Sequence, residues 1–146
     1  MTVGQLDLVR AFFAGAPDDL VAAIEDPEWV AAAREGLAPL LAADFEFVTV
    51  RQSVGMPGTG RGVERFLNAY RAYAEMWESY SLKPTRFVEA GDHVVVEAKI
   101  AGITRTGGVP LEQDVAAVYS FADGRIRRIE EFSDVASAYE AAGAER

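Results

Sequence analysis

Glu131 is the residue of this sequence best placed for acid–base chemistry. In the run Arg125–Phe132, β-rich residues alternate with charged ones, as in a strand whose side chains point to opposite faces. Alternation places Glu131 on one face with Ile129, and the neighbouring run adds Tyr119 and Ala117 to that face. Apolar surroundings raise the pKa of a carboxyl group, which can then act as a general acid or base near neutral pH.

A structural ion pair is the alternative role for Glu131. A buried carboxylate needs a compensating partner, and both Arg51 and Arg127 fall on the same predicted face. The sequence leaves catalysis and pairing open. His93 is the only histidine, but it follows the turn Ala90–Asp92 at the start of a strand, which predicts a surface position rather than a catalytic base.

Ligand contacts are expected from the predicted inner face of the sheet and from one helix. Arg51 and Thr49 could hold a carbonyl or carboxylate group, because an arginine makes paired hydrogen bonds to such groups. Aromatic residues at helical spacing could contact a ligand ring or could fill the core, and a buried tyrosine needs a hydrogen-bond partner. The predicted ligand-binding residues are Thr49, Arg51, Tyr70, Tyr73, Trp77, Ala98, Gln113, Ala117 and Tyr119.

Metal and cofactor chemistry finds no support in the residue types. The chain has no cysteine and one histidine, so it lacks the usual ligand sets of zinc sites. The glycines of the loop 55–60 lack the strand-to-helix setting of a nucleotide-binding fingerprint. We therefore expect no metal and no cofactor.

Hydrophobic periodicity and turn signals predict helices first and then mostly strands. Asp123-Gly124 between two β-rich runs is a strong hairpin signal. Asp26 followed by Pro27 predicts a helix start. The predicted helices cover about 6–13, about 20–24 (capped by Asp18), 27–41, 62–80 and 135–142, and the predicted strands cover 45–51, 82–89, 93–102, 111–121 and 125–132.

This order of elements indicates an α+β fold, and the 146 residues fit one domain, residues 1–146. The formal net charge of −9 disfavours nucleic acid and anionic membranes as partners. The sequence shows no signal peptide pattern and no apolar run of the ~20 residues that span a bilayer, so we expect a cytoplasmic protein.

An apolar stripe marks the other face of the predicted sheet. It consists of Val95, Ala116, Val118 and Phe132. A solvated sheet face normally alternates apolar with polar residues, so an apolar outer stripe predicts a covered surface. We expect a homodimer that forms through this outer face.

Several segments resemble the SnoaL-like branch of the nuclear transport factor 2 superfamily. They are Gly60–Val63 at the start of a helix, Glu89–Val96, Gly107–Val109, Tyr119–Ile126 and Ala138–Gly143. The resemblance covers about residues 44–143 and implies a cone-shaped barrel. In that fold a strongly curved, mostly antiparallel sheet wraps around N-terminal helices and one long helix and encloses an apolar pocket.

The catalytic residues of the better known branches are largely absent. The ketosteroid isomerase type needs a carboxylate on strand one, where Phe47 and Thr49 stand, and an acidic donor where Ala117 stands. The epoxide hydrolase type needs an Arg and an Asp where Ala98 and Ile100 stand, and only its remaining acid matches, at Glu131. Two functions therefore stay open: a pocket for an apolar or aromatic metabolite with acid–base chemistry through Glu131, or a non-catalytic dimeric binding module.

Overall fold

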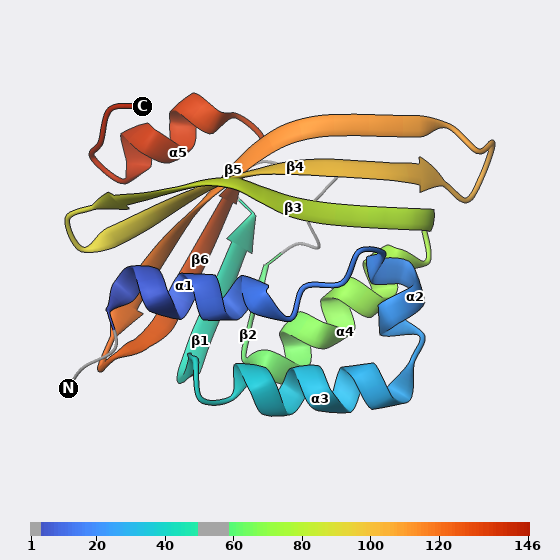
Figure 1. Cartoon of the computed structure of the whole chain (residues 1–146), viewed down its shortest axis with the longest axis horizontal. Helices are drawn as coiled ribbons and strands as arrows, with labels where there is room; N and C mark the ends of the chain where they lie inside the picture. The colour runs from blue at the N-terminus through green and yellow to red at the C-terminus, as the bar shows by residue number, and fades with distance from the viewer. Residues whose placement is uncertain (1–3, 50–58) are drawn as a thin grey trace.

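The computed structural model describes residues 4–49 and 59–146 (Figure 1). No helix in this part of the chain is long and apolar enough to cross a membrane. The elements in chain order are α1 (Gln5–Ala14), α2 (Leu20–Ile24), α3 (Pro27–Leu37), β1 (Leu41–Thr49), β2 (Gly60–Arg61), α4 (Val63–Ala74), β3 (Trp77–Ala90), β4 (His93–Thr104), β5 (Pro110–Ala122), β6 (Arg125–Phe132) and α5 (Val135–Ala141).

The strands of the described residues form one curled sheet between two layers of helices. Its order is β2-β1-β6-β5-β4-β3, with β1 and β6 parallel and all other neighbours antiparallel. Helices α1 to α4 lie on one side of the sheet and α5 lies on the other (Figure 1). This arrangement confirms the predicted α+β fold with a strongly curved, mostly antiparallel sheet wrapped around helices.

Two of the predicted turn and cap signals act as expected. Asp123 and Gly124 have φ values of 53° and 74°, the conformation in which a two-residue hairpin turn matches the strand twist. The side chain of Asp26 accepts a hydrogen bond from the backbone N–H of Glu28 at 3.0 Å, with Pro27 as the first helical residue. Local chemistry therefore fixes both the β5–β6 hairpin and the start of α3.

Several predicted boundaries are wrong, including the strand starts predicted at 45 and 82, which lie at Leu41 and Trp77. The helix predicted to run from 62 to 80 ends at Ala74, and Trp77 begins β3 instead. The helix predicted to reach 41 ends at Leu37. Asp19, not Asp18, caps α2, because its Oδ1 accepts hydrogen bonds from the backbone N–H groups of both Val21 and Tyr80, each at 3.1 Å. This carboxylate thus ties the start of α2 to β3.

A register shift in β6 overturns the predicted position of Arg127. Ser120 pairs with Arg128 and Phe121 pairs with Ile126, so Arg127 has no partner on β5 and the simple alternation breaks. Ile126 is therefore fully buried, and Arg127 forms an ion pair with Asp44, Nε to Oδ2 3.2 Å. The predicted ion pair between Arg127 and Glu131 is therefore absent.

Helix α5 covers the apolar stripe of the outer sheet face. Val95, Ala116, Val118 and Phe132 are buried against the side chains of α5, and the cluster also includes Ala138 and Tyr139. The stripe thus has a partner within its own chain. The homodimer stays a prediction, but this stripe no longer supports it.

Gly102 provides the first stability prediction. A Cβ atom at this position would lie 2.7 Å from the ring of Trp77 and 2.8 Å from the carbonyl oxygen of Ser79. We expect Gly102→Ala to lower the free energy of unfolding by about 1–3 kcal/mol through overpacking, measured by urea denaturation. Gly36→Ala is the control, because a Cβ at Gly36 in α3 meets no atom within 4 Å. Equal stability of the two variants would contradict the close fit at Gly102.

Candidate functional site: an apolar cavity beside a buried carboxyl group

Glu131 lies on the concave side of the sheet, on β6. In the strand register it stands between Ala117 of β5 and Thr49, the last described residue of β1. In the part of the chain that the structure describes, its carboxyl group makes no hydrogen bond or ion pair. Burial raises its pKa from 4.5 to about 8, so the group is mostly protonated at neutral pH.

Three tyrosines, of which Tyr70 and Tyr119 are buried and Tyr73 is half-buried, lie near enough to this carboxyl group to feel its charge. Burial, and then the charge that Glu131 carries when ionised, raises the pKa of the hydroxyls of Tyr70 and Tyr119. Burial also raises the pKa of Tyr73 to about 12, and the charge of Glu131 contributes in the same direction. These hydroxyls therefore stay protonated near neutral pH and can donate hydrogen bonds. The Tyr73 hydroxyl and the Nε1 of Trp77 are buried near each other, and the indole acts on the pKa of this hydroxyl in the direction opposite to burial.

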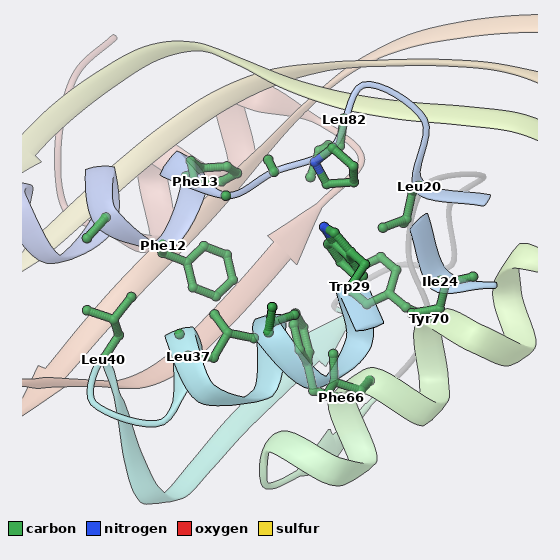
Figure 2. A pocket seen from close by; sticks show the side chains of 18 residues that line it. Phe12, Phe13, Leu20, Ile24, Trp29, Leu37, Leu40, Phe66, Tyr70 and Leu82 are labelled. Atoms are coloured by element: carbon green, nitrogen blue, oxygen red, sulfur yellow. The ribbon is translucent and has the colours of Figure 1, made fainter. Parts of the chain in front are cut away.

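The cavity of greatest interest lies between the helices and β3, with a volume of about 370 Å³. Figure 2 shows aromatic and aliphatic side chains from α1, α2, α3, α4 and β3 around it. None of the described side chains that line it is charged. The lining consists of Ala11, Phe12, Phe13, Gly15, Ala16, Pro17, Leu20, Ile24, Trp29, Ala32, Ala33, Gly36, Leu37, Leu40, Phe66, Leu67, Tyr70 and Leu82.

A second, much smaller void of about 30 Å³ lies against the sheet and contains Glu131 in its wall. The other lining residues are Phe13, Leu82, Val96, Ala98, Val115, Ala116, Ala117 and Tyr119. Such a volume holds a water molecule or one small group. The carboxyl group is therefore next to the apolar cavity but not in its wall.

Comparison with known proteins places this fold in a family. A family model described as the SnoaL-like domain matches residues 21–129. The chain belongs to the SnoaL-like domain family. No curated protein matches the sequence.

Several solved structures have the same fold as this SnoaL-like domain. A protein from Catenulispora acidiphila with a ketosteroid isomerase-like fold, in complex with trimethylamine, has a TM-score of 0.62 and 20% identity, covering 95% of this chain and 94% of that one. A candidate SnoaL-like polyketide cyclase from Jannaschia sp. has a TM-score of 0.58 and 17% identity, and the match covers 90% of this chain and 97% of that one. TerC co-crystallised with polyporic acid has a TM-score of 0.57 and 23% identity, and the match covers 94% of this chain and 98% of that one.

The predicted site residues of this SnoaL-like domain fall into separate groups. Tyr70 lines the large cavity, and the residues of the small void are Ala98, Ala117, Tyr119 and Glu131. Tyr73 and Trp77 belong to an aromatic cluster with Tyr80, with ring centroids 5.3 to 6.0 Å apart. The Nε2 of Gln113 donates a hydrogen bond to the Ser133 carbonyl oxygen at 3.4 Å. Thr49 is described by its backbone register, and Arg51 lies outside the described residues.

Apart from Tyr70, the residues that line the large cavity were not among the predicted ligand-binding residues. Most of them come from α1, α2 and α3, whose apolar positions look like ordinary helix contacts in the sequence. The informative signal is a set of small residues on α3, Ala32, Ala33 and Gly36, which line the cavity together with large aromatic side chains. Only the arrangement of α1, α3 and α4 around the cavity in the folded chain shows that this space exists.

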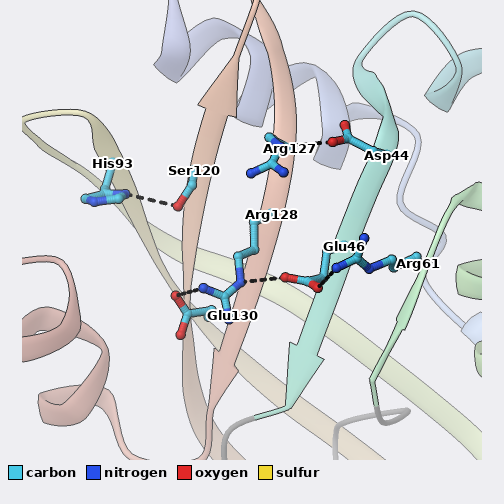
Figure 3. Close-up of polar contacts among 8 residues, drawn as sticks. All are labelled: Asp44, Glu46, Arg61, His93, Ser120, Arg127, Arg128 and Glu130. Atoms are coloured by element: carbon cyan, nitrogen blue, oxygen red, sulfur yellow. Dashed lines mark hydrogen bonds and ion pairs between the residues drawn. The ribbon is translucent and has the colours of Figure 1, made fainter.

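Polar residues gather on the opposite, outer face of the sheet (Figure 3). Arg128 forms ion pairs with Glu46 at 3.0 Å and with Glu130 at 3.3 Å. His93 is half-buried, and its Nδ1 lies 3.1 Å from the hydroxyl of Ser120. These residues pair with one another, and no group of three metal-ligating side chains occurs among the described residues.

Proposed function

We propose that this protein binds a small, uncharged, largely apolar molecule in the cavity between α1, α2, α3, α4 and β3. The observation that carries the proposal is the cavity itself, about 370 Å³ with aromatic and aliphatic walls. Ligand sites in proteins have volumes of roughly 300–1,000 Å³ and mostly apolar linings with few polar groups. Other hollows among the described residues have similar or larger volumes, but charged side chains line them, so the apolar wall is what distinguishes this cavity.

The lining also indicates the chemical class of the ligand. A charged ligand would lose its hydration without gaining a partner, because none of the described lining side chains carries a charge. Rings of Phe12, Trp29, Phe66 and Tyr70 favour an aromatic or polycyclic ligand, since aromatic pairs gain from edge and offset contacts (Figure 2). The relatives crystallised with trimethylamine and with polyporic acid fit a general role of this fold in holding small organic molecules.

Acid–base catalysis through Glu131 is the second candidate. It is favoured by a carboxyl group without a partner in the described chain, with a pKa of about 8. Such a group can release and recover a proton at neutral pH. Tyr119 lines the same void and offers a hydroxyl that could donate a hydrogen bond to a ligand oxygen. Catalysis requires a ligand that extends from the large cavity to this carboxyl group.

Binding is tested with the uncharged fluorophore N-phenyl-1-naphthylamine. We expect saturable binding in the micromolar range, with a rise in probe fluorescence as the probe leaves water. Gly36→Phe should weaken binding at least tenfold, because Gly36 lines the cavity and its Cβ position is open space. Ala31→Phe is the matched control, since it adds the same ring to an exposed position of the same helix that does not line the cavity.

Two outcomes would overturn the proposed function. One is the absence of saturable binding of the probe up to its solubility limit. The other is equal affinity of wild type and Gly36→Phe, because the probe would then bind elsewhere. Circular dichroism of both variants checks that each keeps the fold.

A further inference from the structure

The large cavity and the small void share two wall residues. Phe13 and Leu82 are the side chains that line both the 370 Å³ cavity and the 30 Å³ void. Phe13 comes from the last turn of α1 in the helical layer, and Leu82 comes from β3 of the sheet (Figure 2). Every other lining residue belongs to one space alone. Phe13 and Leu82 are therefore the wall that the cavity shares with the small void, and Tyr70 of the cavity wall lies near enough to Glu131 to feel its charge.

Phe13 is held by aromatic contacts that lead toward the sheet. Its ring centroid lies 6.1 Å from that of Tyr119 and 6.0 Å from that of Phe87. Phe12 also meets Tyr119, at 5.7 Å, and meets Phe66 at 6.2 Å. Both adjacent phenylalanines thus contact Tyr119 of the sheet, while Phe12 also contacts Phe66 of α4 and Phe13 also contacts Phe87 of β3.

Small residues create the space behind this boundary. In the strand register Glu131 faces Ala117, which faces Val96, and Ala98 stands two residues along β4. Two alanines in this part of the sheet leave room in front of the carboxyl group that larger side chains would fill. The carboxyl group has no partner in the described chain, and such a group normally has a protein, water or ligand partner.

We propose that Phe13 and Leu82 form a partition that sets the length of ligand this protein accepts and decides whether the ligand reaches Glu131. A short apolar ligand stays in the cavity among the helices. A longer ligand enters the small void only when the partition is displaced or cut back. This inference rests on the proposed ligand-binding function and makes the two side chains specificity determinants of that site.

The test uses straight-chain primary alcohols from 1-hexanol to 1-dodecanol, which compete with N-phenyl-1-naphthylamine. For wild type, affinity should rise about fourfold for each added methylene and then level off when the alcohol fills the cavity. In Leu82→Ala the plateau should move to alcohols at least two carbons longer. Phe13→Leu, a milder change in the same partition, should shift the plateau in the same direction.

Leu37→Ala is the matched control. It removes the same atoms from a wall of the large cavity that has no share in the small void. The carboxyl carbon signal of Glu131 in an NMR spectrum gives the second measurement. Long alcohols should shift this signal in Leu82→Ala and should leave it unchanged in Leu37→Ala.

The outcomes separate the partition from the function on which it rests. Suppose that the alcohols bind, that Leu82→Ala and Leu37→Ala shift the plateau by the same chain length, and that long alcohols affect the Glu131 signal equally in both variants. The proposed partition is then wrong, and the binding function stands. If neither the fluorophore nor any alcohol binds wild type or the variants, the binding function itself fails, and the partition fails with it.

Discussion

Replacing Glu131 with glutamine is expected to remove most of the loss of stability that the wild-type protein suffers between about pH 5 and pH 9. In the folded protein burial raises the pKa of Glu131 from 4.5 to about 8. Folding therefore takes up a proton in this range, and stability falls as the pH rises. The stabilisation that protonated Glu131 provides is fully present below its unfolded pKa of 4.5 and is lost as the pH rises through its folded pKa of about 8.

The expected size of this effect is large for a small domain. A pKa change from 4.5 to about 8 corresponds to a loss on the order of 4–5 kcal/mol, against a total stability of roughly 5–15 kcal/mol. Urea denaturation at several pH values, followed by tryptophan fluorescence, measures it. Glutamine keeps the shape of the side chain and carries no charge at any pH, so its stability should stay nearly flat.

Glu130→Gln is the matched control for this experiment. Glu130 is the neighbouring residue on β6, and it lies on the outer face in an ion pair with Arg128 (Figure 3). Its variant should keep the wild-type decline with pH. A decline of equal slope in wild type and Glu131→Gln would show that another group, or a partner of Glu131, governs the effect.

Local signals in the sequence were enough for much of the fold. The hairpin at Asp123-Gly124 and the start of α3 at Asp26-Pro27 depend on backbone conformations and hydrogen bonds within a few residues. Alternation along β6 also placed Glu131 on the inner face, and the register with Ala117 agrees. These features need no knowledge of distant parts of the chain.

Features that depend on distant contacts could not be predicted in the same way. Trp77 continues the helical spacing of Tyr70 and Tyr73, yet it pairs with Thr104 as part of β3. The side chain of Asp44 provides the partner of Arg127, 83 residues away in the sequence. The apolar stripe was expected to meet a second copy, because a sequence shows that a face is covered but not by what.

The candidate site also combines features that local patterns predict with features that depend on distant contacts. Glu131, Ala117 and Tyr119 were predicted from strand alternation and do line one void. The larger cavity arises where three short N-terminal helices meet α4 and β3, and no periodicity within one helix reveals a space between several. Its position moves the ligand-binding proposal from the centre of the sheet to the helical layer.

Tyr139→Ala is expected to be the most damaging substitution on the outer face, with a loss of about 3–5 kcal/mol in the free energy of unfolding. Tyr139 is 2% exposed in α5, and its ring packs on the apolar stripe of the sheet. Its hydroxyl donates a hydrogen bond to Oε2 of Glu97 at 2.6 Å. A helix of seven residues gains little stability alone, so these contacts hold α5 in place.

The charge of Glu97 explains why the hydroxyl is important. Glu97 is 7% exposed, and burial alone would raise its pKa. The hydrogen bond from Tyr139, the bond from Arg146 at 2.8 Å and the positive charge of Arg86 outweigh burial, so the pKa of Glu97 is lowered. Its stabilising contribution is present above the unfolded pKa and is lost as the pH falls through the lower folded pKa.

Tyr139→Phe separates the ring from the hydroxyl. It keeps the packing on the stripe but leaves the Glu97 carboxylate without its closest donor, which should cost about 1.5–3 kcal/mol at pH 7. The difference from wild type should shrink as the pH falls through the lowered folded pKa of Glu97, below which the carboxylate is protonated in both proteins. Ser137→Ala is the control in the same helix, since it loses only an exposed hydrogen bond to Asp134. If Tyr139→Ala unfolds at the same urea concentration as Ser137→Ala, the stripe is held by something other than α5.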